Sequence, residues 1–167
     1  MPAATTADRL ASARGIPEVF DAVKEAVRRV LGKERAGLMV VTQEIGNIPD
    51  GFLGAYFVVG ANAIVVNQTP LRRIKETEPA LYIPWLFGVL LHEYLHSLGI
   101  LDEAQVRKAT DEVAAAALGP DHPATRMAAN PMEYIGNLAW PHVFWAPSDV
   151  PFEIVKGLDR DSTSYIQ

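Results

Sequence analysis

The chain has 167 residues, of which 49% are hydrophobic and 21% charged, a balance that predicts a single globular domain with a proper core. Its net charge of −5 disfavours a polyanion such as nucleic acid as a partner. Because there is no cysteine, disulfides, thiolate metal sites and a cysteine nucleophile are excluded, and histidine and carboxylates remain as the strong zinc ligands.

Residues 1–15 are polar and rich in alanine and threonine, and we expect them to form a flexible segment that precedes a single domain over residues 16–167. This N-terminus lacks the basic and then apolar order of a secretory signal. The longest apolar run, residues 81–91, is too short to span a bilayer. These features favour a cytoplasmic protein with no membrane partner.

The first half of the predicted domain combines one helix with short strands. Apolar residues recur at helical spacing over Ile16–Leu31, which predicts a packing helix. Three short runs rich in β-branched residues predict strands at 37–43, 55–59 and Ala63–Asn67. Residues 60–62 have the composition of a hairpin turn between the second and third strands.

Residues 92–96 read HEYLH, and this pattern carries the chemistry of the chain. On a helix, His92 and His96 share one face about 6 Å apart, so both imidazoles can bind one zinc ion from the same side. Glu93 is turned by about 100° from His92, so it can reach a water on the metal as a general base without being a ligand. The residues before the motif are apolar nearly all round, which predicts that this helix is buried.

A third metal ligand is expected shortly after the motif. Gly99 can adopt the left-handed conformation that ends a helix, and Asp102 can then reach the open side of the metal. Asp102 also begins a capping-box pattern with Gln105, so capping of the next helix would explain it equally. The residues that stay open as substitutes for the third ligand are Glu103, Asp111, Glu112 and His122.

The C-terminal half is expected to be helical and irregular. Glu103–Leu118 is rich in alanine and is followed by Gly119, which predicts a helix and its end. Residues 130–134 read NPMEY, and residues 140–157 are rich in aromatics and proline. We expect the latter stretch to be an irregular segment packed on the body of the domain.

The extended pattern HExxHxxGxxD at 92–102 resembles the metzincin branch of the zincin metallopeptidases, most of which have a histidine where this chain has Asp102. The resemblance implies an α+β fold with a small mixed sheet packed on an N-terminal helix and a buried active-site helix. It implies a methionine turn under the metal, which Met132 fits, and a tyrosine that donates to the developing oxyanion, which Tyr134 fits. It also implies a strand beside the cleft that pairs with extended substrate, for which we expect Ala63–Asn67.

The expected function is therefore a zinc-dependent peptidase that acts on a peptide or protein. His92, His96 and Asp102 are the expected ligands of Zn²⁺, and Glu93 and Tyr134 are the expected catalytic residues. A non-catalytic protein that is braced by zinc, or that binds a peptide, is the main alternative. A zinc-dependent endoribonuclease of the ribosome-maturation kind spaces its ligands similarly, but it lacks the glutamate after the first histidine, and the acidic charge disfavours RNA.

Overall fold

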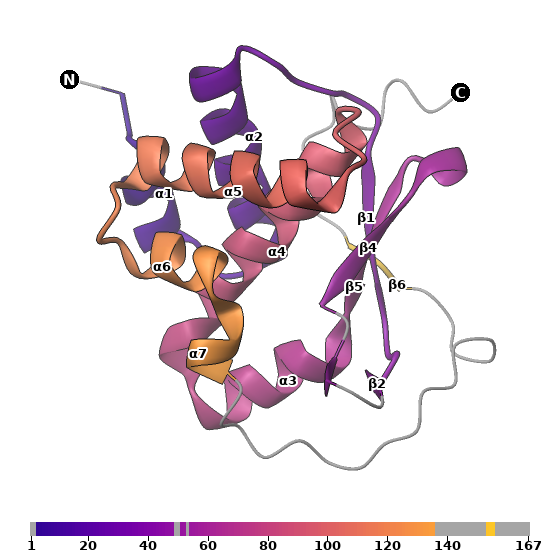
Figure 1. The fold of residues 1–167 in the computed structure, drawn as a ribbon. Coiled ribbons are helices and arrows are strands. Elements are labelled where there is room, and N and C mark those ends of the chain that lie inside the picture. Colours follow the sequence, from indigo (N-terminus) through magenta and orange to yellow (C-terminus); the bar gives the residue numbers. More distant parts are fainter. Residues whose placement is uncertain (1–2, 49–50, 53, 136–152, 156–167) are drawn as a thin grey trace.

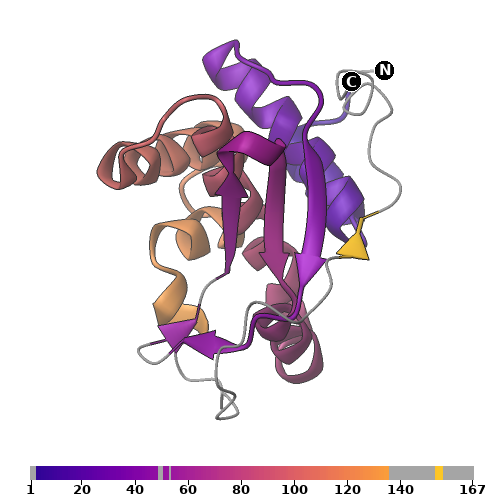
Figure 2. The same cartoon turned by 90° about the vertical axis from the view of Figure 1, so that its right-hand side faces the viewer.

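The computed structural model describes residues 3–48, 51–52, 54–135 and 153–155. These residues form an α+β fold in which helices pack against one face of a small mixed sheet (Figures 1 and 2). The helices are α1 (Thr6–Ser12), α2 (Ile16–Leu31), α3 (Gln68–Thr77), α4 (Tyr82–Ser97), α5 (Glu103–Leu118), α6 (Pro123–Ala129) and α7 (Pro131–Ile135). No helix within the described ranges is long and apolar enough to cross a membrane.

The main sheet has the strand order β4-β5-β1-β6. Its strands are β1 (Met39–Gln43), β4 (Ala55–Val58), β5 (Ala63–Asn67) and the two-residue β6 (Glu153–Ile154), and β2 (Asn47–Ile48) and β3 (Gly51–Phe52) form a separate hairpin. Strand β5 runs parallel to β1 and antiparallel to β4, with which it forms the expected hairpin. The predicted fold class, α+β with a small mixed sheet, is confirmed at this level.

The prediction that Ala63–Asn67 borders the cleft is wrong, because β5 lies between β1 and β4. All five residues of β5 are buried, as expected for a central strand flanked by β1 and β4. Strand β4 occupies the edge of the described sheet instead. Its unpaired backbone groups are therefore the ones that an extended chain could meet.

The expected flexible segment at residues 1–15 contains helix α1. Thr5 and Asp8 form a reciprocal capping box, in which Asp8 N–H donates to Thr5 Oγ1 at 3.1 Å and Thr5 N–H donates to Asp8 Oδ2 at 2.9 Å. Leu10 is only 5% exposed and belongs to the core cluster. The polar composition of the segment gave no indication of the buried Leu10 side chain or of the Thr5–Asp8 capping box. Together these are enough to dock a short helix.

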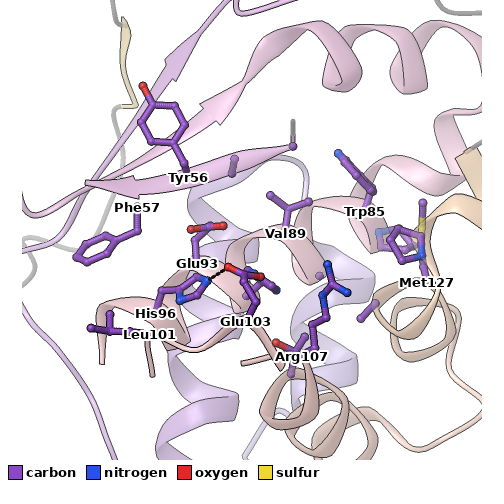
Figure 3. Close-up of a pocket in the computed structure, with 18 residues that line it drawn as sticks. Tyr56, Phe57, Trp85, Val89, Glu93, His96, Leu101, Glu103, Arg107 and Met127 are labelled. Atoms are coloured by element: carbon purple, nitrogen blue, oxygen red, sulfur yellow. Dashed lines mark hydrogen bonds and ion pairs between the residues drawn. The ribbon is translucent and has the colours of Figure 1, made fainter. Parts of the chain in front are cut away.

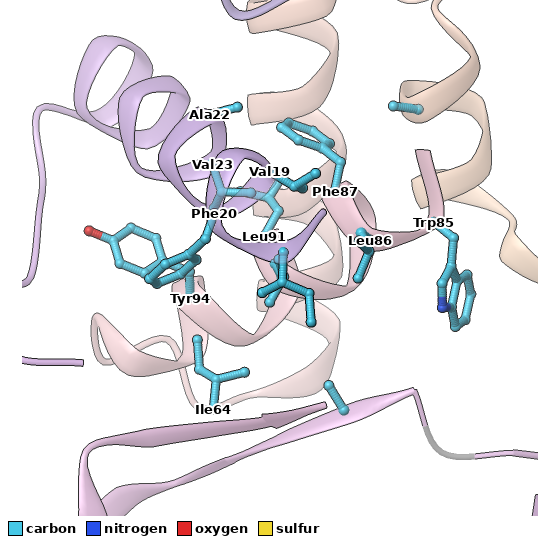
Figure 4. Close-up of a cluster of buried hydrophobic side chains, with 14 of the residues drawn as sticks. Val19, Phe20, Ala22, Val23, Ile64, Trp85, Leu86, Phe87, Leu91 and Tyr94 are labelled. Carbon is cyan, nitrogen blue, oxygen red and sulfur yellow. The ribbon is translucent and has the colours of Figure 1, made fainter. Parts of the chain in front are cut away.

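Helix α4 runs through the centre of the core (Figure 4). Leu86, Phe87, Leu90, Leu91 and Leu95 are fully buried, and each such side chain contributes about 1.5–3 kcal/mol of burial free energy. Tyr94, also fully buried, meets the ring of Phe20 edge-on at 5.7 Å between centroids, and its hydroxyl accepts a hydrogen bond from Arg35 N–H at 2.9 Å. The predicted burial of the motif helix is therefore confirmed.

We expect Leu10→Ala to lower the free energy of unfolding by about 2 kcal/mol or more, since it opens a cavity beneath α1. The matched control Arg9→Ala changes an exposed residue of the same helix and should stay within about 0.5 kcal/mol of the parent. Denaturant unfolding followed by circular dichroism measures both. Equal stabilities for the two variants would contradict the docking of α1.

Candidate metal centre

Three side chains converge at the C-terminal end of α4: His92, His96 and Glu103. Figure 3 shows His96 and Glu103 turned toward each other. The candidate ligand atoms lie within 4.8 Å of one another. Glu103 bridges the two histidines, with Oε1 2.8 Å from His96 Nε2 and Oε2 3.3 Å from His92 Nε2. Two imidazoles and one carboxylate that meet in this way can hold a metal ion.

The turn after α4 brings the carboxylate to the histidines. Gly99 has a φ of 103°, in the left-handed region that favours glycine, and its N–H donates to His96 O at 3.0 Å. The chain then reverses, and α5 begins at Glu103 beside the motif. The predicted role of Gly99 as the helix-ending residue is confirmed by this geometry.

The same turn sets the tautomer of His96. Its Nδ1 lies 2.7 Å from Ile100 O, and because a carbonyl only accepts, Nδ1 carries the hydrogen. With that hydrogen on Nδ1, Nε2 is the ring atom left to bind a metal ion in the three-residue group. Burial also lowers the pKa of His92, against the opposing effect of Glu103, and this favours the neutral form that binds metals.

Asp102, the expected third ligand, lies outside this group. It is the N-cap of α5, and its Oδ2 accepts a hydrogen bond from Gln105 N–H at 2.9 Å. Its short side chain is turned toward the amides of its own helix, whereas Glu103, the next residue, faces α4. Of the residues considered for the third ligand, Glu103 is the one that the structure brings to the two histidines.

Asp111, Glu112 and His122 are not part of the group found among the described residues. Asp111 and Glu112 lie two turns further along α5. His122 is the N-cap of α6, where its Nδ1 accepts a hydrogen bond from Ala124 N–H at 3.1 Å. Its ring therefore has a structural role.

Glu93 lies beside the group without belonging to it. Its side chain is buried, with 8% of the residue exposed, and burial raises its pKa to about 8, with a further contribution from the charge of Glu103. The backbone N–H of Phe57, in edge strand β4, donates to its carboxylate and acts in the opposite direction. A divalent cation at the neighbouring group would favour the charged form, which is the form that accepts a proton.

A cavity of about 670 Å³ opens over the site, a size typical of ligand pockets (Figure 3). Edge strand β4 and helices α4, α5 and α6 all contribute to its lining. The lining residues are Gly54, Ala55, Tyr56, Phe57, Pro84, Trp85, Gly88, Val89, His92, Glu93, His96, Leu101, Glu103, Arg107, Thr110, Met127, Ala128 and Pro131.

The structure describes the side chain of one of the two expected site residues in α7. Tyr134 lies in α7 and packs against the hydrophobic core, and it is not among the lining residues. Met132 also lies in α7, but its side chain falls outside the described part of the structure. Met127, on α6, is the methionine found among the described residues that line the cavity. The aromatic segment 140–157 lies mostly outside the described residues.

Sequence reasoning missed Arg107, Leu101 and the backbone N–H of Phe57. The position of Arg107, four residues after Glu103, was the available signal, because i and i+4 share a helix face. The role of Phe57 depends on strand order, for which the chain carries no local signal.

Comparisons with protein-family models, curated proteins and solved structures find no match for this chain.

We expect Glu103→Gln to weaken zinc binding by about 100-fold or more, because it removes a charged ligand. Asp102→Asn is the matched control, since asparagine also caps helices, and its affinity should stay within a few-fold of the parent. Competition titration with a chromophoric zinc chelator measures both. Loss of affinity in Asp102→Asn but not in Glu103→Gln would restore Asp102 as the ligand.

Proposed function

We propose that this protein is a zinc-dependent peptidase of the zincin type. The observation that carries the proposal is the buried carboxylate of Glu93 beside the His92–His96–Glu103 group, at the wall of a cavity. A site that only braces the fold needs no additional buried carboxylate next to its ligands. A hydrolytic site needs one as a proton acceptor.

The donor set fits zinc. Two histidine nitrogens and one glutamate oxygen form one of the three-ligand sets of catalytic zinc sites, which leave a fourth position open. The contact of His96 Nδ1 with Ile100 O leaves Nε2 to bind the metal, and the lowered pKa of His92 favours its neutral imidazole, the form that binds zinc. Zinc bound there would supply a Lewis acid that polarises a carbonyl and lowers the pKa of water.

The chain's own residues then have distinct roles. Glu93 accepts the proton of the attacking water and delivers it to the leaving amine, so that the peptide bond is cleaved and water is added across it. Phe57 N–H holds the Glu93 carboxylate in place. Buried apolar residues of α4 around the motif exclude water and strengthen the electrostatic interactions within the site.

Edge strand β4 offers unpaired backbone groups to which an extended peptide can bind. Asn67 N–H donates to Gly54 O at 2.9 Å, and the backbone groups of successive residues alternate in direction along an antiparallel strand. The backbone groups of Ala55 and Phe57 therefore point away from β5, which agrees with the hydrogen bond from Phe57 to Glu93. A substrate strand can add to this edge directly beside the proton acceptor.

A non-catalytic peptide-binding protein is the second candidate. The bridge from Glu103 to both histidines favours it, because this contact satisfies the three side chains without a metal ion. The cavity and the edge strand would serve such a binder equally.

We expect Glu93→Gln to retain one zinc ion per chain and to lower the rate of peptide hydrolysis by about 10²- to 10⁴-fold, because the amide cannot accept the proton. Glu112→Gln, an exposed change on α5, is the control and should leave both quantities unchanged. A quenched-fluorescence peptide library and metal analysis provide the two readouts. Full activity in Glu93→Gln would rule out the mechanism.

We expect a chelator to abolish hydrolysis and added zinc to restore it. Calorimetry with non-cleaved peptides from the same library separates the two candidates, since a binder shows affinity without turnover. Turnover that persists in the chelated protein would exclude zinc catalysis.

A further inference from the structure

Arg107 is a charged residue of the cavity that the hydrolytic mechanism leaves without a role. It follows Glu103 by four residues on α5, so both lie on the same helix face. Figure 3 shows its side chain between Glu103 and Met127, over the cavity that both line. It has no hydrogen bond or ion pair within the described residues, because Glu103 is turned toward the histidines instead.

The charges of the occupied site would favour an anion near Arg107. A bound divalent cation would offset the carboxylates of Glu93 and Glu103, which leaves the guanidinium as excess positive charge in the cavity. Arg107 is an exposed residue where it lines the cavity, and a guanidinium beside an apolar wall is suited to bind a carboxylate through paired hydrogen bonds.

The part of the cavity next to Arg107 is apolar. Trp85, Val89 and Met127 line it, and Trp85 and Met127 are 5% and 2% exposed. Gly54 and Gly88 line the same compartment without side chains. A Cβ at Gly54 would lie only 3.1 Å from the Trp85 ring, so the compartment depends on small residues at its walls. This space suits a large apolar side chain.

We propose that the cavity binds the C-terminus of a peptide that ends in an apolar residue, with Arg107 as the specificity-determining residue for its free carboxylate. The inference rests on the proposed function in taking a peptide as the ligand. A terminal apolar residue carries an apolar side chain and a carboxylate on one Cα, which matches the adjacent apolar compartment and guanidinium. An internal acidic residue supplies only the carboxylate.

The distance between Glu103 and Arg107 along α5 determines which peptide bond of the substrate lies at the metal group. Four helical residues advance about 6 Å along the axis, roughly the length of two residues of extended chain. With the terminal carboxylate at Arg107, the bond that reaches Glu93 and the metal group is one of the last two. The enzyme then releases one or two residues from the C-terminus by adding water across that bond.

The test uses zinc-loaded Glu93→Gln protein, so that peptides bind without turnover. Three hexapeptides are compared by isothermal titration calorimetry: one ending in leucine as the free acid, the same peptide as the amide, and an amide with an internal glutamate. We expect the free acid to bind about 10- to 100-fold more tightly than either amide. Adding Arg107→Gln should abolish the difference and Arg107→Lys should retain part of it, whereas Lys108→Gln, an exposed neighbour, should leave it unchanged.

Any of four results would overturn the inference. The acid and the amide could bind equally, or the preference for the acid could survive Arg107→Gln. The internal-glutamate amide could bind as tightly as the acid, or no peptide could bind. Hydrolysis assays with the parent protein, which retains Glu93, distinguish failure of this inference from failure of the proposed function. Cleavage of internal bonds in amidated peptides would support the proposed peptidase activity and refute the role of Arg107. If the zinc-loaded protein binds the free acid selectively but never hydrolyses it, the role of Arg107 would stand and the peptidase proposal would be refuted.

Discussion

The site depends on the burial of helix α4. This helix is surrounded by α2, the sheet, α5 and α6, and its apolar residues occupy the centre of the core. One strip of the helix lines the cavity, through Pro84, Trp85, Gly88, Val89, His92, Glu93 and His96. Because the helix is fixed on its other sides, the two imidazoles and Glu93 are held in place without a metal ion. Such preorganisation is what a catalytic metal site needs.

The turn at Gly99 is the second constraint, because it decides which carboxylate reaches the histidines. A residue that caps a helix has its side chain occupied by the amides of that helix. Asp102 is in that position, so the adjacent residue, Glu103, is the first that is free to face α4. The outcome is a His-His-Glu group in place of the His-His-Asp group that the spacing predicts.

Features that depend on local chemistry could be predicted from the sequence. The helix Ile16–Leu31, the β4–β5 hairpin, the buried motif helix and the pairing of His92 with His96 follow from periodicity and spacing over a few residues. Strand order could not be predicted, since it depends on packing between distant segments, and for this reason the placement of Ala63–Asn67 beside the cleft is wrong. Asp102 and Glu103 are adjacent, and only the backbone direction at the turn distinguishes them. The expectation for Tyr134 rests on spacing within a resemblance, and α7 packs it against the core instead.

In the proposed mechanism, the charges around the cavity allow one site to combine a base, a Lewis acid and a selective cation. Glu93 is buried and next to another carboxylate, both of which raise its pKa. A cation at the neighbouring group would reverse that shift, so metal binding and activation of the base are coupled. Arg107 is one helical turn away from Glu103, close enough to add to the field and far enough to leave the metal group open.

The most direct test is a crystal structure of the protein grown with zinc, with anomalous data on both sides of the zinc absorption edge. The account predicts one anomalous peak at about 2.0–2.2 Å from His92 Nε2, His96 Nε2 and a Glu103 oxygen. Glu93 should lie beside the ion without binding it, and Asp102 should still cap α5. Zinc bound through Asp102, or no peak at the three-residue group, would contradict it.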